Sequence, residues 1–437
     1  MSNVSHMRRW ARAGLIALGL GAVLAGCGAQ AASSPPKAHA PVSIVYWAGH
    51  ASGALHAAVV AEVAQFNQTH PGIHVTFVVR GASSHGLEAF EAGQAPNVGM
   101  VSAYIVPQLV QAGALVPLTS YLNGPNGLTA ADIHNLYYPA VWNDMKEGTK
   151  IQYMMPLEKK SIVVLYYNEA LFRKAGISTP PRTWAQVGTD AAKITALGPQ
   201  YHGIAWTPYL QQFFDMVLAD GGRIFTTQTG RRAYSLDNRG GREALTMLRS
   251  WIQNGSMILT TGYEYQLDFG TGDVGMLIDA SAGYTYDKSS VGGKFVMGGE
   301  AAPAGTSGHS AQYINGASLV MFNVGTAAQK AASWTFMKWL SSPATNVYWD
   351  EHTNYLPLGP QEAALMRAFY AAHPAQAASF SNPAYWWFKP RTPNFEASVT
   401  PMQAVLEQAL QGKIGIPAAL QRMSTVGTQY LSGKVRG

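Results

Sequence analysis

Four polar residues, Glu158, Lys159, Lys160 and Ser161, stand directly before a run of β-branched and aromatic residues at 162–168, IVVLYYN. Such a run is typical of a buried strand. The polar groups before it are either ligand contacts or solvated loop charges. We expect the stretch 152–168 to be the first crossing of the chain between two lobes, with a ligand cleft beside it.

Residues 279–283, DASAG, contain a serine and a glycine in the spacing of a GxSxG nucleophile motif, but Asp279 replaces the first glycine. The chain has no GxxxxGK[ST] phosphate loop and no HExxH zinc helix, and its histidines are scattered. Paired carboxylates for glycoside hydrolysis need only proximity in space, so the sequence leaves them open. We expect a protein that is not an enzyme, with no cofactor and no metal.

The first 26 residues are predicted to be a lipoprotein signal peptide. Arg8, Arg9 and Arg12 form a basic region, and an apolar stretch and small residues follow. The sequence LAGC at 24–27 resembles the bacterial lipobox, which implies cleavage before Cys27 and a lipid on its sulfur. The alternatives are an ordinary signal peptide or an anchor helix, with Cys27 incidental. Cys27 is the only cysteine, so no intramolecular disulfide can form.

Residues 27–40 are small, polar and proline-rich, which predicts a flexible tether. The remaining chain is long enough for two domains. Removal of the signal peptide leaves 27 basic and 24 acidic residues and lowers the net charge from +6 to +3. The chain has no long basic run, so nucleic acid is not an expected partner. The later apolar stretches are too short or too charged for a transmembrane helix.

The order of elements predicts an α/β fold. Residues 42–47 and 73–79 are predicted strands, and 54–67 is a predicted helix between them. A strand–helix–strand unit with tight connections predicts a parallel sheet with covered faces. A further buried strand is predicted at 273–278, and the chain is mostly helical after 327. Two α/β lobes that exchange chain several times fit this order.

Four segments follow one another along the chain: YW with FNQTHPGIHV and APNVGMVS, then VVLYYNEALFRKAGI with PPRTWAQV, then GDVGMLIDASAG, and last INGASLVMFN with TNYLPLG. Together they resemble the family 1 solute-binding proteins of bacterial ABC importers, and glycerol-3-phosphate-binding proteins most of all. The resemblance implies a periplasmic-binding-protein-like fold with a ligand cleft between two α/β lobes. It implies three hinge crossings, which we expect near 156–163, 275–279 and 318–324. The first lobe would comprise 41–158 and 279–321, and the second 159–278 and 322–437.

The resemblance also implies a function. Such a protein binds its solute on the outer face of the cell membrane, closes its hinge and delivers the ligand to permease subunits. We expect a lipid-anchored monomer that binds a carbohydrate. The alternatives are an exported sensor or adhesin with the same fold, or a glycan-active enzyme.

Carbohydrate recognition needs aromatic faces and planar polar groups. Trp47 ends the first strand, where open α/β sheets place ligands. By resemblance, five further positions are expected to contact ligand, with packing as the alternative for each: Trp206, Tyr209, Ser281, Gly316 and Tyr355.

Other positions depart from the phosphate-binding relatives. Glu158 and Ser161 stand where those carry small hydroxyl and amide residues, Ser84 where they carry a tyrosine, and Ala103-Tyr104 where they carry a glutamate. Val399 aligns with their phosphate-contacting arginine, which Arg391 or Arg80 would have to replace. We therefore expect a neutral sugar, oligosaccharide or polyol derivative, and keep glycerol 3-phosphate or a glycerophosphodiester as the alternative.

Overall fold

The structure is a computed structural model that describes residues 40–147, 151–228, 230–380, 383–391 and 394–434. The predicted signal peptide, Cys27 and all but the last residue of the predicted tether lie outside the described residues. Within the described ranges, no helix combines the length and the hydropathy that a bilayer-spanning segment needs.

The first lobe is built on a five-stranded sheet in the order β2-β1-β3-β16-β6. Its strands are β1 (Val42–Ala48), β2 (Ile73–Val79), β3 (Val98–Ser102), β6 (Met154–Pro156) and β16 (Ala317–Met321). β1 runs parallel to β2 and β3, whereas β16 is antiparallel to β3 and β6. The predicted βαβ unit is therefore confirmed.

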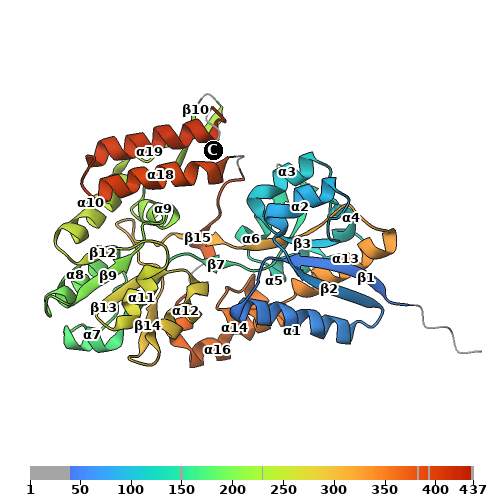
Figure 1. Ribbon diagram of the computed structural model, residues 1–437, viewed down its shortest axis with the longest axis horizontal. Helices are drawn as coiled ribbons and strands as arrows, with labels where there is room; N and C mark the ends of the chain where they lie inside the picture. The colour runs from blue at the N-terminus through green and yellow to red at the C-terminus, as the bar shows by residue number, and fades with distance from the viewer. Residues whose placement is uncertain (1–39, 148–150, 229, 381–382, 392–393, 435–437) are drawn as a thin grey trace, which may run out of the picture. The chain divides into compact units, whose positions relative to one another are not determined.

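Helices cover both faces of this sheet (Figure 1). On one face, α1 (Gly53–Thr69) packs with α13 (Ala327–Leu340) and α14 (Pro343–Thr353) around buried Phe66 and Phe336. On the other, α2 (Ala82–Glu91) and α3 (Val106–Gln111) share a core with buried Phe322. Shorter elements complete the lobe: α4 (Thr119–Leu122), α5 (Ala130–Leu136), α6 (Pro139–Asn143), β4 (Lys146–Glu147), β5 (Ile151–Gln152) and α15 (Pro360–Leu365).

The second lobe has a five-stranded sheet in the order β12-β9-β13-β8-β14. The strands are β8 (Val164–Asn168), β9 (His202–Trp206), β12 (Met257–Leu259), β13 (Val274–Asp279) and β14 (Met297–Glu300). β8 and β13 are buried almost throughout, as their apolar runs predict, and they pair antiparallel.

Two groups of helices cover this second sheet. One face carries the large core shared by α8 (Trp184–Thr195), α9 (Leu210–Ala219), α10 (Arg239–Gln253), α18 (Phe395–Leu410) and α19 (Ile416–Leu431). The other carries α11 (Glu264–Thr271) and α12 (Tyr284–Val291). The remaining elements near this lobe are α7 (Glu169–Lys174), β10 (Phe225–Gln228), β11 (Arg231–Tyr234), α16 (Arg367–Ala372) and α17 (Pro374–Ala377).

Local signals explain where several helices begin. Thr183 was predicted to cap the helix that starts at Trp184, and its hydroxyl accepts a hydrogen bond from the backbone N–H of Gln186. The Gln186 side chain in turn accepts from the Thr183 N–H, which completes a capping box. Thr326 caps α13 in the same way.

A small three-stranded sheet in the order β17-β15-β7 lies on the connections between the two large sheets. β7 (Lys160–Ser161) follows β6, β15 (Gln312–Asn315) lies between β14 and β16, and β17 (Trp386–Trp387) lies between α17 and α18. The connections are therefore residues 157–163, 301–316 and 366–394. Their number agrees with the predicted fold of two α/β lobes and three crossings.

The positions of the second and third crossings differ from the prediction. β13, expected at a crossing, stays within the second sheet, and the chain next changes sheets between β14 and β16. Residues 281–300 therefore belong to the second lobe, because β14 pairs with β8. Residues 327–358 belong to the first lobe, because α13 and α14 bury Trp334 and Trp349 in its core. The third crossing comes only after α15.

Two close contacts fix the first connection, one against β16 and one against the end of the second connection. The Lys159 ammonium is almost fully buried and donates to the carbonyls of Ala317 and Glu158 and to the Ser318 hydroxyl, at 2.6, 3.3 and 3.2 Å. Its three donors are thus used. Gly316 has a φ of +140°, and a Cβ there would lie 2.1 Å from the carbonyl oxygen of Glu158.

Gly316→Ala is therefore expected to lower the free energy of unfolding by about 3 kcal/mol, since it adds backbone strain and a steric clash. Urea unfolding at neutral pH measures it. Gly93→Ala is the matched control, because Gly93 also has a positive φ, +69°, but nothing within 4 Å of its Cβ position. That variant should lose only about 1 kcal/mol. Equal losses in the two variants would contradict the close packing at Gly316.

Candidate functional site

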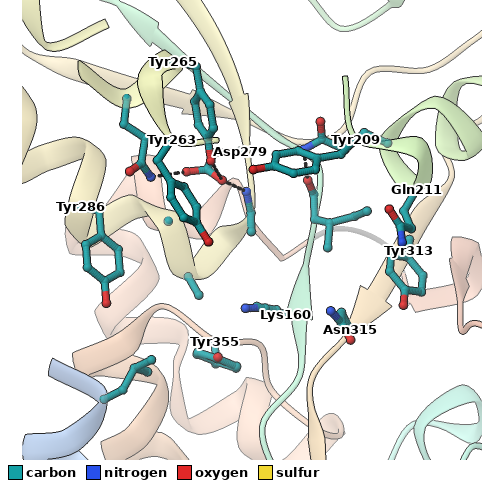
Figure 2. Close-up of a pocket in the computed structure, with 17 residues that line it drawn as sticks. Lys160, Tyr209, Gln211, Tyr263, Tyr265, Asp279, Tyr286, Tyr313, Asn315 and Tyr355 are labelled. Carbon is teal, nitrogen blue, oxygen red and sulfur yellow. Dashed lines mark hydrogen bonds between the residues drawn. The ribbon is translucent and has the colours of Figure 1, made fainter. Parts of the chain in front are cut away.

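A cavity of about 630 Å³ lies where residues of both lobes meet the hinge strands β7 and β15. Six tyrosines line it and form its largest chemical group: Tyr209, Tyr263, Tyr265, Tyr286, Tyr313 and Tyr355. In Figure 2, Tyr263 and Tyr286 lie on one side and Tyr313 and Gln211 on the other, with Lys160 between them. We call this space the tyrosine pocket.

The polar lining of the tyrosine pocket is mostly neutral. The groups that can hydrogen-bond a ligand, besides the tyrosines, are Lys160, Gln211, Gln212, Gln266, Asp279 and Asn315. Lys160 is the single cation and Asp279 the single carboxylate among the described lining residues. The Nζ atom of Lys160 lies 5.6 Å from the centre of the Tyr355 ring.

Gln212 is held in place by a residue outside the pocket. Trp206 is fully buried at the end of β9, and its indole N–H donates to Gln212 Oε1 at 2.6 Å. Gln212 Nε2 donates to the carbonyl of Ile162 at 2.8 Å, in the first connection. Trp206 therefore acts on the pocket through Gln212 and does not line it.

Asp279 is a fixed part of the wall. Its Oδ1 accepts from the Tyr265 hydroxyl and the Ala280 N–H, and its Oδ2 accepts from Gln266, at 2.6 to 2.8 Å. Burial raises the pKa of Asp279, and these hydrogen bonds oppose that rise. Gly283 is required beside it, since a Cβ there would lie 2.0 Å from Asp279 Oδ2.

Tyr355 follows a residue that joins the lobes. Asn354 ends α14 with a φ of +55°, a conformation that asparagine tolerates better than most residues. Its amide donates to the carbonyl of Ser281 at 2.8 Å and to the Ser379 hydroxyl at 3.1 Å. The wall that carries Tyr355 is thereby tied to the second lobe.

A smaller pocket of about 200 Å³ adjoins the first and shares Lys160 and Asn315 with it. Glu158 lies in its lining, and Glu158 Oε2 bonds His50 Nε2 at 2.8 Å. Burial alone would raise the pKa of Glu158. The hydrogen bond from His50 and the positive charges of His50, Lys160 and Lys159 outweigh burial, so the pKa lies below its usual value. An ionised carboxylate thus stands at the first-lobe end of the site.

Four of the residues predicted as ligand contacts line these pockets. Tyr209 and Tyr355 line the tyrosine pocket, and Glu158 and Gly316 line the smaller one. Their contact with ligand stays a prediction.

The other predicted contacts lie outside both linings. Trp47 is buried in the first lobe under the guanidinium of Arg80, and Ser161 bonds the backbone of Val163. The Ser281 side chain is fully buried. Tyr104 lies under Lys389 on the surface.

Ser84 and Arg391 are likewise occupied elsewhere. The Ser84 hydroxyl donates to the carbonyl of Gly81 at 3.3 Å, whereas its neighbour Ser83 lines the smaller pocket. Arg391 pairs with Asp144 at 3.3 Å and donates to the carbonyl of Lys146. Its guanidinium is thus engaged outside both pocket linings.

Several residues that line the tyrosine pocket were not among the predicted ligand contacts. Tyr313 and Asn315 stand within three residues of Gly316, and Tyr263 and Tyr265 alternate in GYEY. Clustering beside a predicted contact was thus a usable signal. Nothing local marks Tyr286, which reaches the pocket from α12. Among the described residues, no group of three or more His, Cys, Asp or Glu could hold a metal ion.

Two lobes around a lined cavity define a ligand-binding protein. The chain belongs to the bacterial extracellular solute-binding protein family, whose model matches residues 51–347. This membership confirms the resemblance noted in the sequence. Proteins of this class bind small-molecule ligands and deliver them to the permeases of ABC importers.

Curated relatives are distant. A binding protein of Brucella abortus is 26% identical over 297 residues, which cover 66% of this chain and 68% of the relative. The sn-glycerol-3-phosphate-binding periplasmic protein UgpB of Yersinia enterocolitica is 26% identical over 192 residues, or 42% of this chain and 43% of that protein. The match to UgpB thus spans less than half of either chain.

Solved structures share the fold. The cyclic alpha-maltosyl-1,6-maltose binding protein of Arthrobacter globiformis superimposes with a TM-score of 0.75 at 18% identity, covering 90% of this chain and all of the other. UgpB of Mycobacterium tuberculosis, in complex with glycerophosphocholine, gives 0.74 at 18% identity, covering 90% and 99%. At these identities the likeness shows the fold alone.

His50→Ala is expected to lower the free energy of unfolding at pH 7 by about 2 kcal/mol, because the buried Glu158 carboxylate loses a charged hydrogen bond. Since the folded-state pKa of Glu158 lies below its unfolded value, this stability is present above the unfolded pKa and is lost as pH falls through the folded one. The difference between variant and wild type should therefore shrink in acid, as urea titrations at several pH values would reveal.

His85→Ala is the control for this experiment. His85 is half exposed and lies 4.0 Å from Glu88, which is 79% exposed. Its removal should change stability by less than about 0.5 kcal/mol at any pH. A His50 variant that behaves like this control would contradict an ionised Glu158 in the folded protein.

Proposed function

We propose that this protein captures a carbohydrate, either a neutral sugar, an oligosaccharide or a polyol derivative, in the tyrosine pocket and delivers it to a membrane permease. The observation that carries the proposal is the pocket lining, in which six tyrosines and four glutamine or asparagine groups converge besides one lysine. The ring faces suit the C–H faces of a sugar, and the hydroxyls and amides suit its hydroxyl groups.

The size of the cavity supports a ligand of one to a few sugar units. Ligand pockets in proteins commonly measure about 300–1,000 Å³, and this one falls within that range. Residues of both lobes line it, so a bound ligand would contact both at once. The mechanism we propose is closure of the two lobes on the ligand, which favours the closed form through its additional contacts.

The charge of the lining supports a neutral ligand. A dianion in an enclosed site needs several cations or strong donors. Lys160 is the single cation among the described lining residues, while Arg80 lies 4.4 Å over Trp47 and Arg391 pairs with Asp144. Glycerol 3-phosphate, a dianion near neutral pH, is therefore disfavoured.

A glycerophosphodiester is the second candidate. A phosphodiester carries one negative charge, which Lys160 could balance, and the nearby ring of Tyr355 offers an aromatic face to a cationic head group. The UgpB relatives and the glycerophosphocholine-bound neighbour favour keeping it.

Binding alone, without catalysis, is part of the proposal. Asp279 is the only carboxylate among the described residues that line the tyrosine pocket, and three donors already bond it. Glycoside hydrolysis requires a pair of carboxyl groups flanking the scissile bond. We also propose that the protein is a monomer held at the outer membrane face by a lipid on Cys27.

Ligand binding should raise the melting temperature of the protein by mass action. At a ligand concentration of 100 times Kd the gain is about 2.7 kcal/mol. Maltose, maltotriose, glycerophosphocholine and glycerol 3-phosphate are suitable probes. We expect a shift with a neutral sugar, and a shift with glycerol 3-phosphate alone would overturn the proposal.

Tyr286→Ala should reduce affinity about tenfold or more, whereas Tyr201→Ala, away from the pocket, should not.

Lys160→Met separates the two candidates. Attraction between Lys160 and a phosphodiester would make binding weaker at high salt, and the variant would lose most of that dependence. Binding of a neutral sugar should depend little on salt in wild type and variant alike. Isothermal titration at low and high salt measures both, with Lys413→Met, an exposed lysine, as the control. A salt dependence that Lys160→Met leaves unchanged would exclude Lys160 as the anion contact.

A further inference from the structure

Each lobe contains one pair of buried carboxyl groups that lie side by side. The carboxyl groups of Asp279 and Asp287 stand together in the second lobe, and those of Asp350 and Glu362 in the first, so that a proton on one group of a pair can be donated to the other. All four side chains are buried, with at most 6% of their surface exposed. Two carboxylates in such contact cannot both be ionised without a large cost, since like charges repel and burial penalises each.

The hydrogen bonds of the second-lobe pair show where a proton is needed. Both oxygens of Asp279 accept hydrogen bonds from Tyr265, Gln266 and the Ala280 N–H. In contrast, neither carboxyl oxygen of Asp287 receives a donor from the described residues. A proton on Asp287, donated to Asp279, gives both groups a partner.

The first-lobe pair follows the same pattern. Glu362 Oε2 accepts from the backbone N–H of Leu358 at 3.0 Å. Glu362 Oε1 and Asp350 Oδ2 are the buried oxygens that lack a donor among the described residues. One proton on Glu362 Oε1, donated to Asp350, satisfies both.

The described groups that face the second-lobe pair are mostly tyrosines, and the cation of the adjoining pocket, Lys160, forms no ion pair with Asp279. Tyr166 of β8, Tyr209 before α9 and Tyr265 of α11 face Asp279 and Asp287, and Lys288 of α12 is directed at the ring of Tyr284.

Around the first-lobe pair, Tyr137, Tyr138, Tyr370 and Glu62 face Asp350 or Glu362, and Glu351 lies on the same helix as Asp350. Among the described residues, no lysine, arginine or histidine forms an ion pair with any of the four carboxyls.

Each pair lies directly behind a wall of the tyrosine pocket. Asp279, Tyr265 and Gln266 line the pocket, and Asp287 stands beside Asp279 outside the lining. On the opposite wall, the Glu362 carboxyl accepts from the backbone N–H of Leu358 and so fixes the end of the segment 354–358, which carries Tyr355. Asp350 lies on α14 directly before this segment, and its backbone carbonyl accepts from the N–H of Asn354.

We propose that Asp287 and Glu362 are positioning residues. Asp287 shares one proton with Asp279, and Glu362 shares one with Asp350. In acidic and neutral media these two protons keep the two walls of the ligand pocket in position. The reference to a ligand rests on the proposed function. The device suits a protein exposed to an external medium, because acid strengthens these contacts, whereas it breaks ordinary ion pairs.

The direction of the pH dependence follows from linkage. Burial raises the pKa of Asp287 to about 10, and the charge of Asp279 adds to the rise. Burial likewise raises the pKa of Asp350 to about 8 and that of Glu362 well above its usual value. In the unfolded chain these groups ionise near pH 4. Their stabilisation is therefore full below that pH and is lost as pH rises through the folded-state pKa values.

Urea unfolding of the ligand-free protein tests the proposal. Between about pH 5 and pH 7, the two shared protons by themselves make the unfolding equilibrium constant rise about a hundredfold per pH unit. Asp215 and Glu62, whose pKa values burial also raises, add to this slope in wild type and variants alike. Asp287→Asn and Glu362→Gln replace the protonated acids by amides that can donate the same hydrogen bond. Each single variant should reduce the factor by which the unfolding equilibrium constant rises per pH unit about tenfold, and the double variant should reduce it about a hundredfold. Glu88→Gln, on the surface, should leave it unchanged.

A second measurement counts protons directly. On unfolding by urea in weakly buffered solution at pH 7, the double variant should release about two protons fewer than the wild type, as detected with a pH electrode. Equal proton release by the two proteins, or variants with the same pH dependence as wild type, would overturn the proposal. Because neither experiment contains ligand, such a failure would leave the proposed function standing. A ligand screen without any binding would likewise leave the proton-sharing pairs intact.

Discussion

The backbone hydrogen bonds among β7, β15 and β17 are the constraint on which the rest of the structure depends. They join the three connections between the lobes into one small sheet. Asp215 of α9 ties this sheet to the second lobe, since its Oδ1 accepts from the Tyr313 N–H at 2.8 Å and from the Trp387 indole at 2.6 Å. Lys159 ties it to β16 of the first lobe. The closure that we propose would therefore turn about this short segment.

The pocket follows from this constraint. β7 and β15 carry Lys160 and Asn315 into the space between the lobes, and both residues line the large and the small pocket. The tyrosines reach the same space from separate elements, and the hydroxyl of Tyr265 is held by the buried carboxylate of Asp279. Polar residues that serve the site indirectly, such as Trp206 and Asn354, are as buried as the apolar core. A buried polar group costs free energy unless it is hydrogen-bonded, so these contacts are tightly defined.

Much of the architecture could be predicted from local patterns. The βαβ unit at the start, the buried runs of β8 and β13, and the cap at Thr183 each follow from residues close in sequence. The positions of the second and third crossings could not, because β13 and β14 look alike as isolated strands whichever sheet they join. Pairing with β8 placed both in the second lobe. Likewise, residues 327–358 belong to the first lobe because α13 and α14 bury one face in its core.

The sequence by itself determined the family, the two-lobed α/β fold and the wealth of tyrosine and amide side chains, since these depend on residue type and order. Only the tertiary structure decided which aromatics face the cavity. Trp47 and Trp206 end strands as ligand contacts often do, yet packing buries them, while Tyr286 enters from a helix with no distinguishing pattern. The physical reason is that a pocket is formed by segments far apart in the chain. Tertiary packing decides whether a side chain faces solvent, the core or a partner carboxyl group, and the local spacing of residues does not encode this.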